Sequence, residues 1–464
     1  MKGLYILICC VLVMIGECCG SEGNSYPTDG ERLSISLEEA INMALARNRS
    51  LISLTNALES DQLNVAVAES AFDLKLTPST TAGVSDGVSS FSAGVALSKA
   101  LFSGPVVSVA PELGRSDEDY NGSVSLSMTM PLFRGRGEDV NRAYVRASEF
   151  SFRSAQRSYY VSEVNTVIST VSAVYDILRL RDLAQLYRRQ INTMTFYAAA
   201  SEIKKNAGLA TPMDVYRAEI RLKDMEDGLS ATLQTLADGE ENLKRLLSLD
   251  AQKTLTVSAP KQYEPVDIDL DGAVDKAIAN RIEMDQAKDT LEDGNRQAAL
   301  ARHNLLPQLD LQMGYRRYGE GERAGSMADF TEDQWTINLA STTDFSRTAE
   351  KAAYRQSLIR IRNAELDMAS QRDTIIAQVK QAMQVLEKNT QRIQIRREQI
   401  QQAQGKLELS KIKYKHGMMD NFDVIEAETE IQQAEVNLLA VQTDYIVGLY
   451  KLRAVMGTLL ERTF

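Results

Sequence analysis

Two very long stretches without helix-breaking residues constrain the fold of this chain most strongly. From Glu138 to Ala207 there is neither glycine nor proline, and in the stretch Glu350–His416 the only such residue is Gly405. A helix of about 70 residues, at about 1.5 Å per residue, would be about 105 Å long. Helices in globular proteins average about 11 residues, so helices of this length need packing partners along their whole length.

Apolar residues repeat in these stretches in steps of three and four. One series covers Tyr160–Leu178, and a second, offset series covers Ile177–Met194. Two offset heptad series on one helix favour packing against neighbours on two sides. A further series covers Val424–Val441. We therefore expect two long antiparallel helical hairpins that turn near Gly208 and Gly417, although a solvated coiled-coil rod fits the helices alone equally well.

The two expected turns belong to an internal repeat. The segments "GLATPMDVYRAEIRL" from Gly208 and "GMMDNFDVIEAETEI" from Gly417 align at a constant offset of 209 positions. Upstream, "LEEAINMAL" from Leu37 resembles "LDGAVDKAI" from Leu270 at an offset of 233. The first copy therefore carries an insertion of roughly 20 residues. We expect a first unit over residues 21–248, a linker over 249–268 and a second unit over 269–464.

The chain begins with the pattern of a secretory signal peptide, which we place at residues 1–20. A dozen or so apolar residues, Leu4–Ile15, follow Lys2, too few to span a bilayer. All four cysteines lie in this segment, so removal of the signal would leave no thiol for a disulfide or a zinc site. Cys18 or Cys19 could instead be the lipidated first residue of a lipoprotein.

Three segments alternate between apolar and polar residues, as amphipathic β-strands do. The clearest is "SVSLSMTMPLF", which starts at Ser123. The apolar residues of the three segments are Val124, Leu126, Met128 and Met130; Leu309, Leu311 and Met313; and Trp335, Ile337 and Leu339. Alternating strands with aromatic residues near their ends are a weak signature of outer-membrane barrels. A soluble antiparallel sheet alternates in the same way.

The strand count bears on how such a sheet could close. Beyond the signal there is no run of about 18 apolar residues, so only a closed barrel could carry this chain across a membrane. Two units with two principal strands each give four strands, and the serine-rich inserted region, residues 85–118, could add an extracellular hairpin. Single-chain barrels begin at about eight strands. We therefore expect several protomers to share one barrel.

Several segments together resemble the TolC-type outer-membrane efflux proteins. They are "SLEEAINMALARN", "PLFRGRGEDVNRA", the paired "GLATPMDVYRAE" and "GMMDNFDVIEAE" turns, and "LRAVMGTL". The resemblance implies a mainly α-helical homotrimer with a twelve-stranded transmembrane β-barrel, continued by an α-helical barrel. It also implies the outer membrane of a Gram-negative bacterium, a position that extends into the periplasm, and contact with outer-membrane lipid.

The same resemblance implies a passive exit duct for a tripartite efflux or type I secretion system. Its partners would be a periplasmic adaptor (membrane fusion) protein and an inner-membrane pump of the RND or ABC type. The pump would choose the cargo, so drug, metal and protein substrates all stay open. No enzymatic activity and no cofactor are expected. A periplasmic coiled-coil structural or adaptor protein is the alternative from another class.

The resemblance also assigns roles near the turns. The tips that would face the adaptor are Gly208, Leu209, Ala210 and Thr211 in the first unit and Gly417, Met418, Met419 and Asp420 in the second. Asp423 and Glu426 would form an acidic ring at the periplasmic entrance, favouring cations. Tyr414 and Asp214 match the family's closing latch, but Met419 stands where the latch has a basic residue. A helix cap is the alternative role for Asp214 and Asp423.

Other classes of function lack support in the sequence. A net charge of −11 and a pI near 5.1 argue against binding nucleic acid. The two histidines, His303 and His416, are too few and too far apart for a metal site or a catalytic triad. We therefore expect neither a metal site nor catalytic residues. The "FRGRG" segment lacks the glycine spacing of a dinucleotide site.

Overall fold

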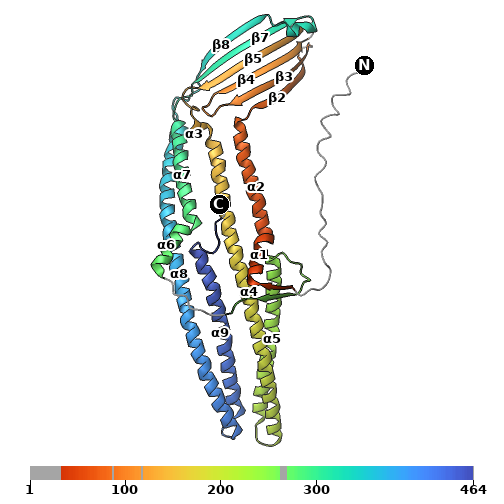
Figure 1. Ribbon diagram of the computed structural model, residues 1–464, viewed down its shortest axis with the longest axis vertical. Coiled ribbons are helices and arrows are strands. Elements are labelled where there is room, and N and C mark those ends of the chain that lie inside the picture. The colour runs from red at the N-terminus through yellow and green to blue at the C-terminus, as the bar shows by residue number, and fades with distance from the viewer. Residues whose placement is uncertain (1–32, 86–87, 117–118, 262–268, 463–464) are drawn as a thin grey trace, which may run out of the picture.

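A long helical body carries a β-sheet at one end (Figure 1). This computed structural model describes residues 33–85, 88–116, 119–261 and 269–462. The expected signal peptide, with Cys18 and Cys19, lies outside the described residues. No helix within the described ranges is long and apolar enough to cross a membrane.

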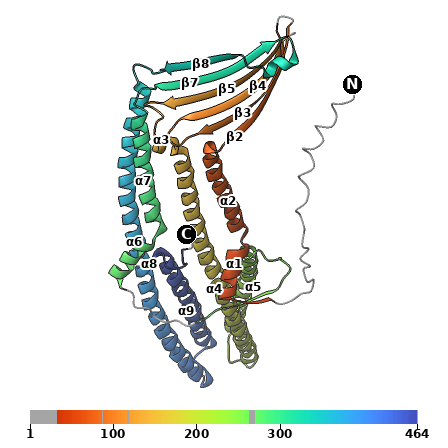
Figure 2. The same ribbon diagram turned by 45° about the horizontal axis from the view of Figure 1, so that its top comes forward.

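The sheet has six described strands in the order β2-β3-β4-β5-β7-β8, and all neighbours are antiparallel. Figure 2 shows them side by side in one continuous, curved layer. A short 3₁₀ helix, η2 (Ala324–Ala328), lies between the last two strands in the chain. The strands are β2 (Lys75–Ser85), β3 (Val88–Ala100), β4 (Val106–Ser116), β5 (Asp119–Pro131), β7 (Asp310–Gly321) and β8 (Glu332–Ala340).

The register gives the sheet one apolar and one polar face. Leu126 of β5 lies opposite Val109 of β4 and Tyr315 of β7, which in turn lies opposite Trp335 of β8. Cross-strand partners share a face, so apolar residues gather on one side of all six strands. Ser125 belongs to the other face, which is rich in serine, threonine and glycine. The alternation read from the sequence is thus confirmed as the pattern of a single sheet.

The expected count of four strands is wrong, because the inserted region forms two further strands. Residues 85–118 supply β3 and β4, which lie between β2 and β5 instead of forming a loop outside the sheet. The apolar–polar alternation of these strands is weak in the sequence, because small residues such as Gly94 and Ala96 share the polar face with serines and because Pro111 interrupts β4. Gly94 also allows close approach, since a Cβ there would lie 2.9 Å from the Pro111 carbonyl oxygen.

Each unit contains a long helix flanked by two shorter ones, and the two expected hairpins are confirmed. In both units, one shorter helix packs beside the half of the long helix nearer the sheet and the other beside the far half (Figure 1). The first unit has α2 (Arg49–Glu69), α3 (Glu138–Asn141), α4 (Ala143–Asn206) and α5 (Pro212–Leu246). The second has α7 (Ile282–His303), α8 (Thr348–Lys415) and α9 (Asn421–Val455).

A smaller layer surrounds the middle of the helices. The strand β1 (Leu33–Ser36) pairs in parallel with β6 (Leu255–Ser258), which lies inside the expected linker. The helices α1 (Leu37–Arg47) and α6 (Leu270–Asn280) occupy equivalent places in the two units, and η1 (Ser70–Phe72) follows α2. The largest apolar core lies here, where α1 and the two short strands pack against α4 and the end of α5. Its fully buried residues include Ala40, Val171, Val174, Ile177 and Leu243.

Candidate functional site

The two hairpin tips have the same backbone geometry. Gly208 and Gly417 follow α4 and α8 with φ of 73° and 71°, the left-handed conformation that favours glycine. The amide of Leu209 donates to the Lys204 carbonyl oxygen (2.8 Å), and the amide of Met418 donates to that of Lys413 (2.9 Å). These are Schellman closures, in which carbonyl groups at the helix end gain donors. The repeat therefore preserves the geometry of the turn as well as its glycine.

The two tips differ in how the following helix begins. Thr211 caps α5: its amide and its hydroxyl donate to Oδ2 of Asp214, at 2.9 and 2.7 Å. The Thr211 hydroxyl, followed by its backbone amide, lowers the pKa of the Asp214 carboxyl. The helix-cap alternative for Asp214 is therefore confirmed. In the second tip Asp420 replaces Thr211 and, as a carboxylate, has no hydroxyl to donate to Asp423.

Large apolar side chains project from both tips. Leu209 is 77% exposed and Met418 is 69% exposed, and Met213 is also exposed near the start of α5. The Arg217 guanidinium of α5 lies 4.9 Å from the ring centre of Phe422 in α9, which connects the two tips. Ala210, by contrast, is half-buried. The tips thus present an apolar surface stiffened by capped helix ends.

Tyr414 lies beside the first hairpin, at the end of α8. Nζ of Lys204 lies 3.5 Å from the centre of its ring, and the Tyr197 ring meets it edge-on at 6.4 Å. Within the described residues, the buried Tyr414 hydroxyl has no hydrogen-bond partner. The carboxylate of Asp214 is bonded to Thr211. Any pairing of Tyr414 with Asp214 across neighbouring hairpins stays a prediction.

Three carboxylates follow one another along the start of α9. Asp423, Glu426 and Glu430 are spaced three and four residues apart, so they share a helix face. Glu426 and Glu430 are exposed and Asp423 is half-buried. Nζ of Lys406 lies 2.7 Å from Oε1 of Glu430. That bond, together with the charges of Glu426 and Asp423, raises the pKa of the Lys406 ammonium group, so this face is electronegative.

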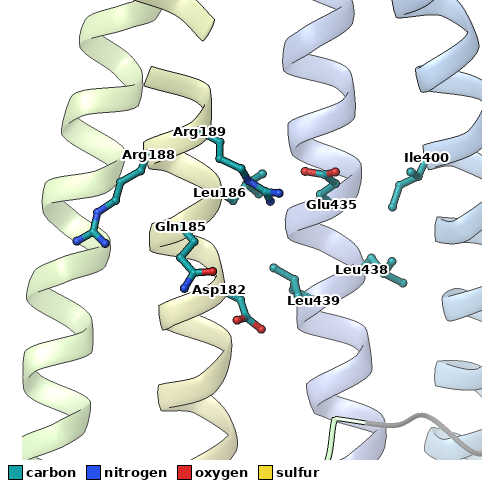
Figure 3. A pocket seen from close by; sticks show the side chains of 9 residues that line it. All are labelled: Asp182, Gln185, Leu186, Arg188, Arg189, Ile400, Glu435, Leu438 and Leu439. Atoms are coloured by element: carbon teal, nitrogen blue, oxygen red, sulfur yellow. The ribbon is translucent and has the colours of Figure 1, made fainter. Parts of the chain in front are cut away.

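A groove of about 600 Å³ separates the two hairpins above the tips (Figure 3). Arg189 of α4 extends toward Glu435 of α9 across this groove. Burial raises the pKa of the Glu435 carboxyl, and the positive charge of Arg189 partly offsets that effect. Nearer the tips, the Asn421 side chain of α9 donates a hydrogen bond to Oγ of Ser201 in α4. The contact between α4 and α9 therefore has a substantial polar part.

One pair of helices makes a contact that the equivalent pair in the repeat does not make within the chain, and we call this the half-complete interface. On α4, Leu186, Gln190 and Tyr197 are buried, but the residues 209 positions later on α8 are exposed. On α9, Ile425, Glu428 and Gln432 are buried, but the residues 209 positions earlier on α5 are exposed. The exposed equivalents are Ile395, Gln399 and Lys406 on α8, and Tyr216, Glu219 and Lys223 on α5. One chain therefore makes the α4–α9 contact and leaves the equivalent surfaces of α8 and α5 open.

The predicted apolar strand residues lie together on the apolar face, with one exception. Leu309 precedes β7, and its carbonyl oxygen accepts a hydrogen bond from the Leu132 amide (2.8 Å). Leu311 and Met313 lie opposite Met130 and Met128, and Val124 completes the series on β5. On β8, Trp335, Ile337 and Leu339 are 75%, 73% and 63% exposed. The described sheet thus leaves much of its apolar face uncovered.

His303 has a structural role that the sequence did not reveal. Its Nε2 accepts a hydrogen bond from the backbone amide of Gly135 (3.1 Å), which ties α7 to the turn after β5. Among the described residues, no group of three or more histidine, cysteine, aspartate or glutamate residues could hold a metal ion.

Comparisons with known proteins agree on one family. The outer membrane efflux protein family matches residues 40–248 and 273–458. Outer membrane protein TolC of Vibrio cholerae is 20% identical over 369 residues, covering 75% of this chain and 81% of TolC. Outer membrane efflux protein BepC of Brucella suis is 22% identical over 346 residues, covering 74% of this chain and 73% of BepC. The fold matches the Campylobacter jejuni CmeC outer membrane channel with a TM-score of 0.73, at 15% identity over 92% of this chain and 87% of CmeC.

We predict that alanine has opposite effects at two kinds of glycine. Gly208→Ala forces a side chain into a left-handed conformation and should destabilise the first hairpin by about 1 kcal/mol. Gly405→Ala, inside α8 with open space around it, should stabilise the protein by up to about 1 kcal/mol. Urea unfolding in detergent measures both changes. Stabilisation by Gly208→Ala would contradict the assigned turn geometry.

We also predict a pH dependence at the first tip. The pKa of Asp214 is lower in the folded chain than in the unfolded one, so its cap stabilises the tip at pH above about 3.9 and is lost as pH falls through the lowered value. Hydrogen exchange of the first turn of α5, corrected for intrinsic rates, should therefore rise as the solution is acidified below pH 4.

Asp214→Asn should remove this pH dependence and cost about 1 kcal/mol of local stability at neutral pH. Asp423→Asn is the matched control and should leave the exchange of α5 unchanged. The same acid-induced rise in the Asp214→Asn variant would assign the effect to another group.

Proposed function

The chain belongs to the outer membrane efflux protein family, and we propose that three copies of it form the exit duct of a tripartite efflux or type I secretion system. The family consists of channel proteins, not enzymes, and the chain is an outer-membrane efflux channel that extends into the periplasm. TolC-type channels form homotrimers that work with adaptor proteins and inner-membrane pumps. The main support for this proposal is the half-complete interface, in which α4 contacts α9 within one chain while the equivalent surfaces of α8 and α5 stay exposed.

That interface supports a ring made of copies. Because the two units are equivalent, the surface of α4 that contacts α9 has a counterpart on α8. That counterpart suits α5, the helix equivalent to α9. Within one chain α8 has α9 but not α5 as a close neighbour. The α5 helix of a second copy would cover Ile395 of α8, which is 51% exposed, and the same contact would cover Tyr216 of that α5 helix, which is 59% exposed. Head-to-tail contacts of this kind close into a ring when the rotation permits.

The proposed ring places the helical hairpins around a channel through the periplasm. At about 1.5 Å per residue, the 64 residues of α4 span about 96 Å and the 68 residues of α8 about 102 Å. Length of this order suits a conduit that begins in the outer membrane and ends near an inner-membrane complex.

We assign the adaptor contact to the hairpin tips, from Gly208 to Thr211 and from Gly417 to Asp420. Their exposed Leu209 and Met418 side chains suit an apolar docking surface on the periplasmic adaptor. The Schellman closures hold both tips in one conformation, which lowers the entropy cost of binding. The identity of the adaptor and of the pump is not determined by this chain alone.

We assign the periplasmic entrance to Asp423 and Glu426. In a trimer these residues would gather six carboxylates at one level, which would favour cations and repel anions. Tyr414 and Asp214 would lie near the same entrance. Within the described residues the buried Tyr414 hydroxyl lacks a hydrogen-bond partner, and a polar group of a neighbouring hairpin that reaches it in the closed state would remove the cost of leaving it unpaired. Because Met419 is uncharged, closure here would not use a salt bridge at that position.

We assign the apolar face of the sheet to lipid and the polar face to a water-filled lumen. A matched pair of variants tests this assignment. Leu126→Arg places a charge on the lipid side and should cost about 2–4 kcal/mol near the membrane midplane. Ser127→Arg, on the polar face opposite Ser108 and Gly314, points into water and should cost little. The amount of assembled protein in the outer-membrane fraction measures the difference. Equal loss with both variants would exclude this orientation of the sheet.

The channel itself is tested in planar bilayers. The purified protein should conduct ions, with a reversal potential in a salt gradient that indicates cation preference. Combining Asp423→Asn with Glu426→Gln should shift that potential toward zero without preventing insertion. A protein that is released by osmotic shock and does not conduct would contradict the proposal and favour a periplasmic structural role.

A further inference from the structure

We propose that β2 of one copy pairs with β8 of the next, so that three copies close a barrel of eighteen strands. This proposal rests on the trimeric channel proposed above, and it goes further by naming the strands that meet and the width that results. The family resemblance implied twelve strands, four from each copy. The six-stranded sheet changes that number.

The two edges of the described sheet have the polarity that closure requires. The order β2-β3-β4-β5-β7-β8 contains only antiparallel steps, so β2 and β8 run in opposite directions. Joining β8 of one copy to β2 of the next therefore continues the antiparallel pattern without a break. Each edge strand otherwise leaves a row of backbone donors and acceptors unpaired, which is costly in a membrane.

The two edges also have matching faces. On β2, Leu76 and Val84 share the apolar side, and they are 65% and 74% exposed. On β8 the apolar side carries Trp335 and Ile337. Pairing the edges would therefore extend one apolar surface around the whole barrel, whereas a shift of one residue would move side chains to the wrong face.

The inserted hairpin is anchored where the sheet meets the helices. At the turn between β3 and β4, the backbone amide of Gly137 donates to the Ser103 carbonyl oxygen (3.0 Å). The Phe102 ring lies 4.7 Å from that of Phe72, and the Arg142 guanidinium lies 5.5 Å from it. These contacts tie β3 and β4 to η1, after the end of α2, and to the start of α4, so the hairpin is a fixed part of the sheet.

The width of such a barrel matches the helical ring below it. Eighteen strands at about 4.8 Å spacing and about 40° tilt give a backbone diameter of about 36 Å, and twelve strands give about 24 Å. Three copies with four helices side by side, at 8–10 Å between axes, give a ring about 31–38 Å across. A barrel of eighteen strands can therefore join the helical ring without a narrow neck.

The lumen face would leave this width open where small side chains cover β2 and β3, and would carry charged side chains on β4 and β7. On β2 and β3 the polar face carries Thr77, Ser79, Thr81, Ser90, Ser92, Gly94 and Ala96. Across the next pair, the Ser108 and Ser127 hydroxyls lie 2.6 Å apart and can share a hydrogen bond. Glu112 of β4 and Arg316 and Glu320 of β7 also lie on this face, so small side chains would leave the interior open while charges of both signs line part of it.

Cysteine pairs test which strands meet, because the sequence has no cysteine after Cys19. Thr77→Cys on β2 is combined in turn with Gln334→Cys, Thr336→Cys and Asn338→Cys on β8, all on the polar face. At least one pair should form disulfides between copies, seen as dimers and trimers on non-reducing gels of outer-membrane protein. The absence of such bands from all three pairs in trimers that conduct would overturn the proposal and leave the channel function intact.

Thr77→Cys with Ser125→Cys is the matched control. In the six-stranded sheet these residues are three strand spacings apart, about 14 Å, which is too far for a disulfide. If the inserted hairpin were displaced from the wall, β2 would pair with β5 and this disulfide would form within one chain. That product would overturn the proposal, and its absence together with cross-linking of β2 to β8 would support it.

Discussion

Over its described residues, a single chain of this protein leaves sheet edges and helix surfaces without partners, and these open surfaces determine how copies assemble. Its sheet ends in two unpaired edges, and its helices expose surfaces on α5 and α8 whose repeat equivalents are buried. Unpaired backbone groups and exposed apolar side chains both cost free energy, and both costs fall when further copies supply the missing neighbours. Assembly of several copies would therefore supply the strand pairing and the helix contacts that a single chain lacks.

The repeat provides the chain with two similar hairpins, but it does not make them identical. Both tips use a left-handed glycine and the same closure, whereas only the first has a threonine–aspartate cap. The second begins with Asp420 and continues with a row of carboxylates on α9. Loss of the cap leaves Asp423 without that hydroxyl donor, so duplication followed by local change can produce one tip with a threonine–aspartate cap and one electronegative entrance.

Much of the architecture could be predicted from the sequence because it depends on periodicity. The spacing of apolar residues located the long hairpins, and the glycines located their turns. The inserted strands were missed because their polar face is made of serine, glycine and alanine, which read like a loop. The start of the long helix was also missed: Arg142 leaves the helical conformation, so α3 ends at Asn141 and α4 begins at Ala143.

Other features depend on tertiary packing and have no local signal. The parallel pairing of Leu33–Ser36 with Leu255–Ser258 joins segments far apart in the chain. The stacking of Lys204 on Tyr414 joins the two units at the tips. The half-complete interface likewise depends on which of two repeat-equivalent residues is buried, and burial is set by tertiary packing. The candidate site was therefore located by sequence, while its geometry and its incompleteness came from the structure.

The central claim is that the contact within one chain is repeated between chains, and disulfide cross-linking tests it most directly. Ser201→Cys with Asn421→Cys, at the observed α4–α9 hydrogen bond, should cross-link within one chain. Tyr197 of α4 and Glu428 of α9 are buried, whereas the residues related to them by the repeat, Lys406 and Glu219, are exposed. Lys406→Cys with Glu219→Cys should therefore cross-link between chains and give a ladder that stops at three. A product that remains a single chain, from protein in which the first pair does cross-link, would contradict the account.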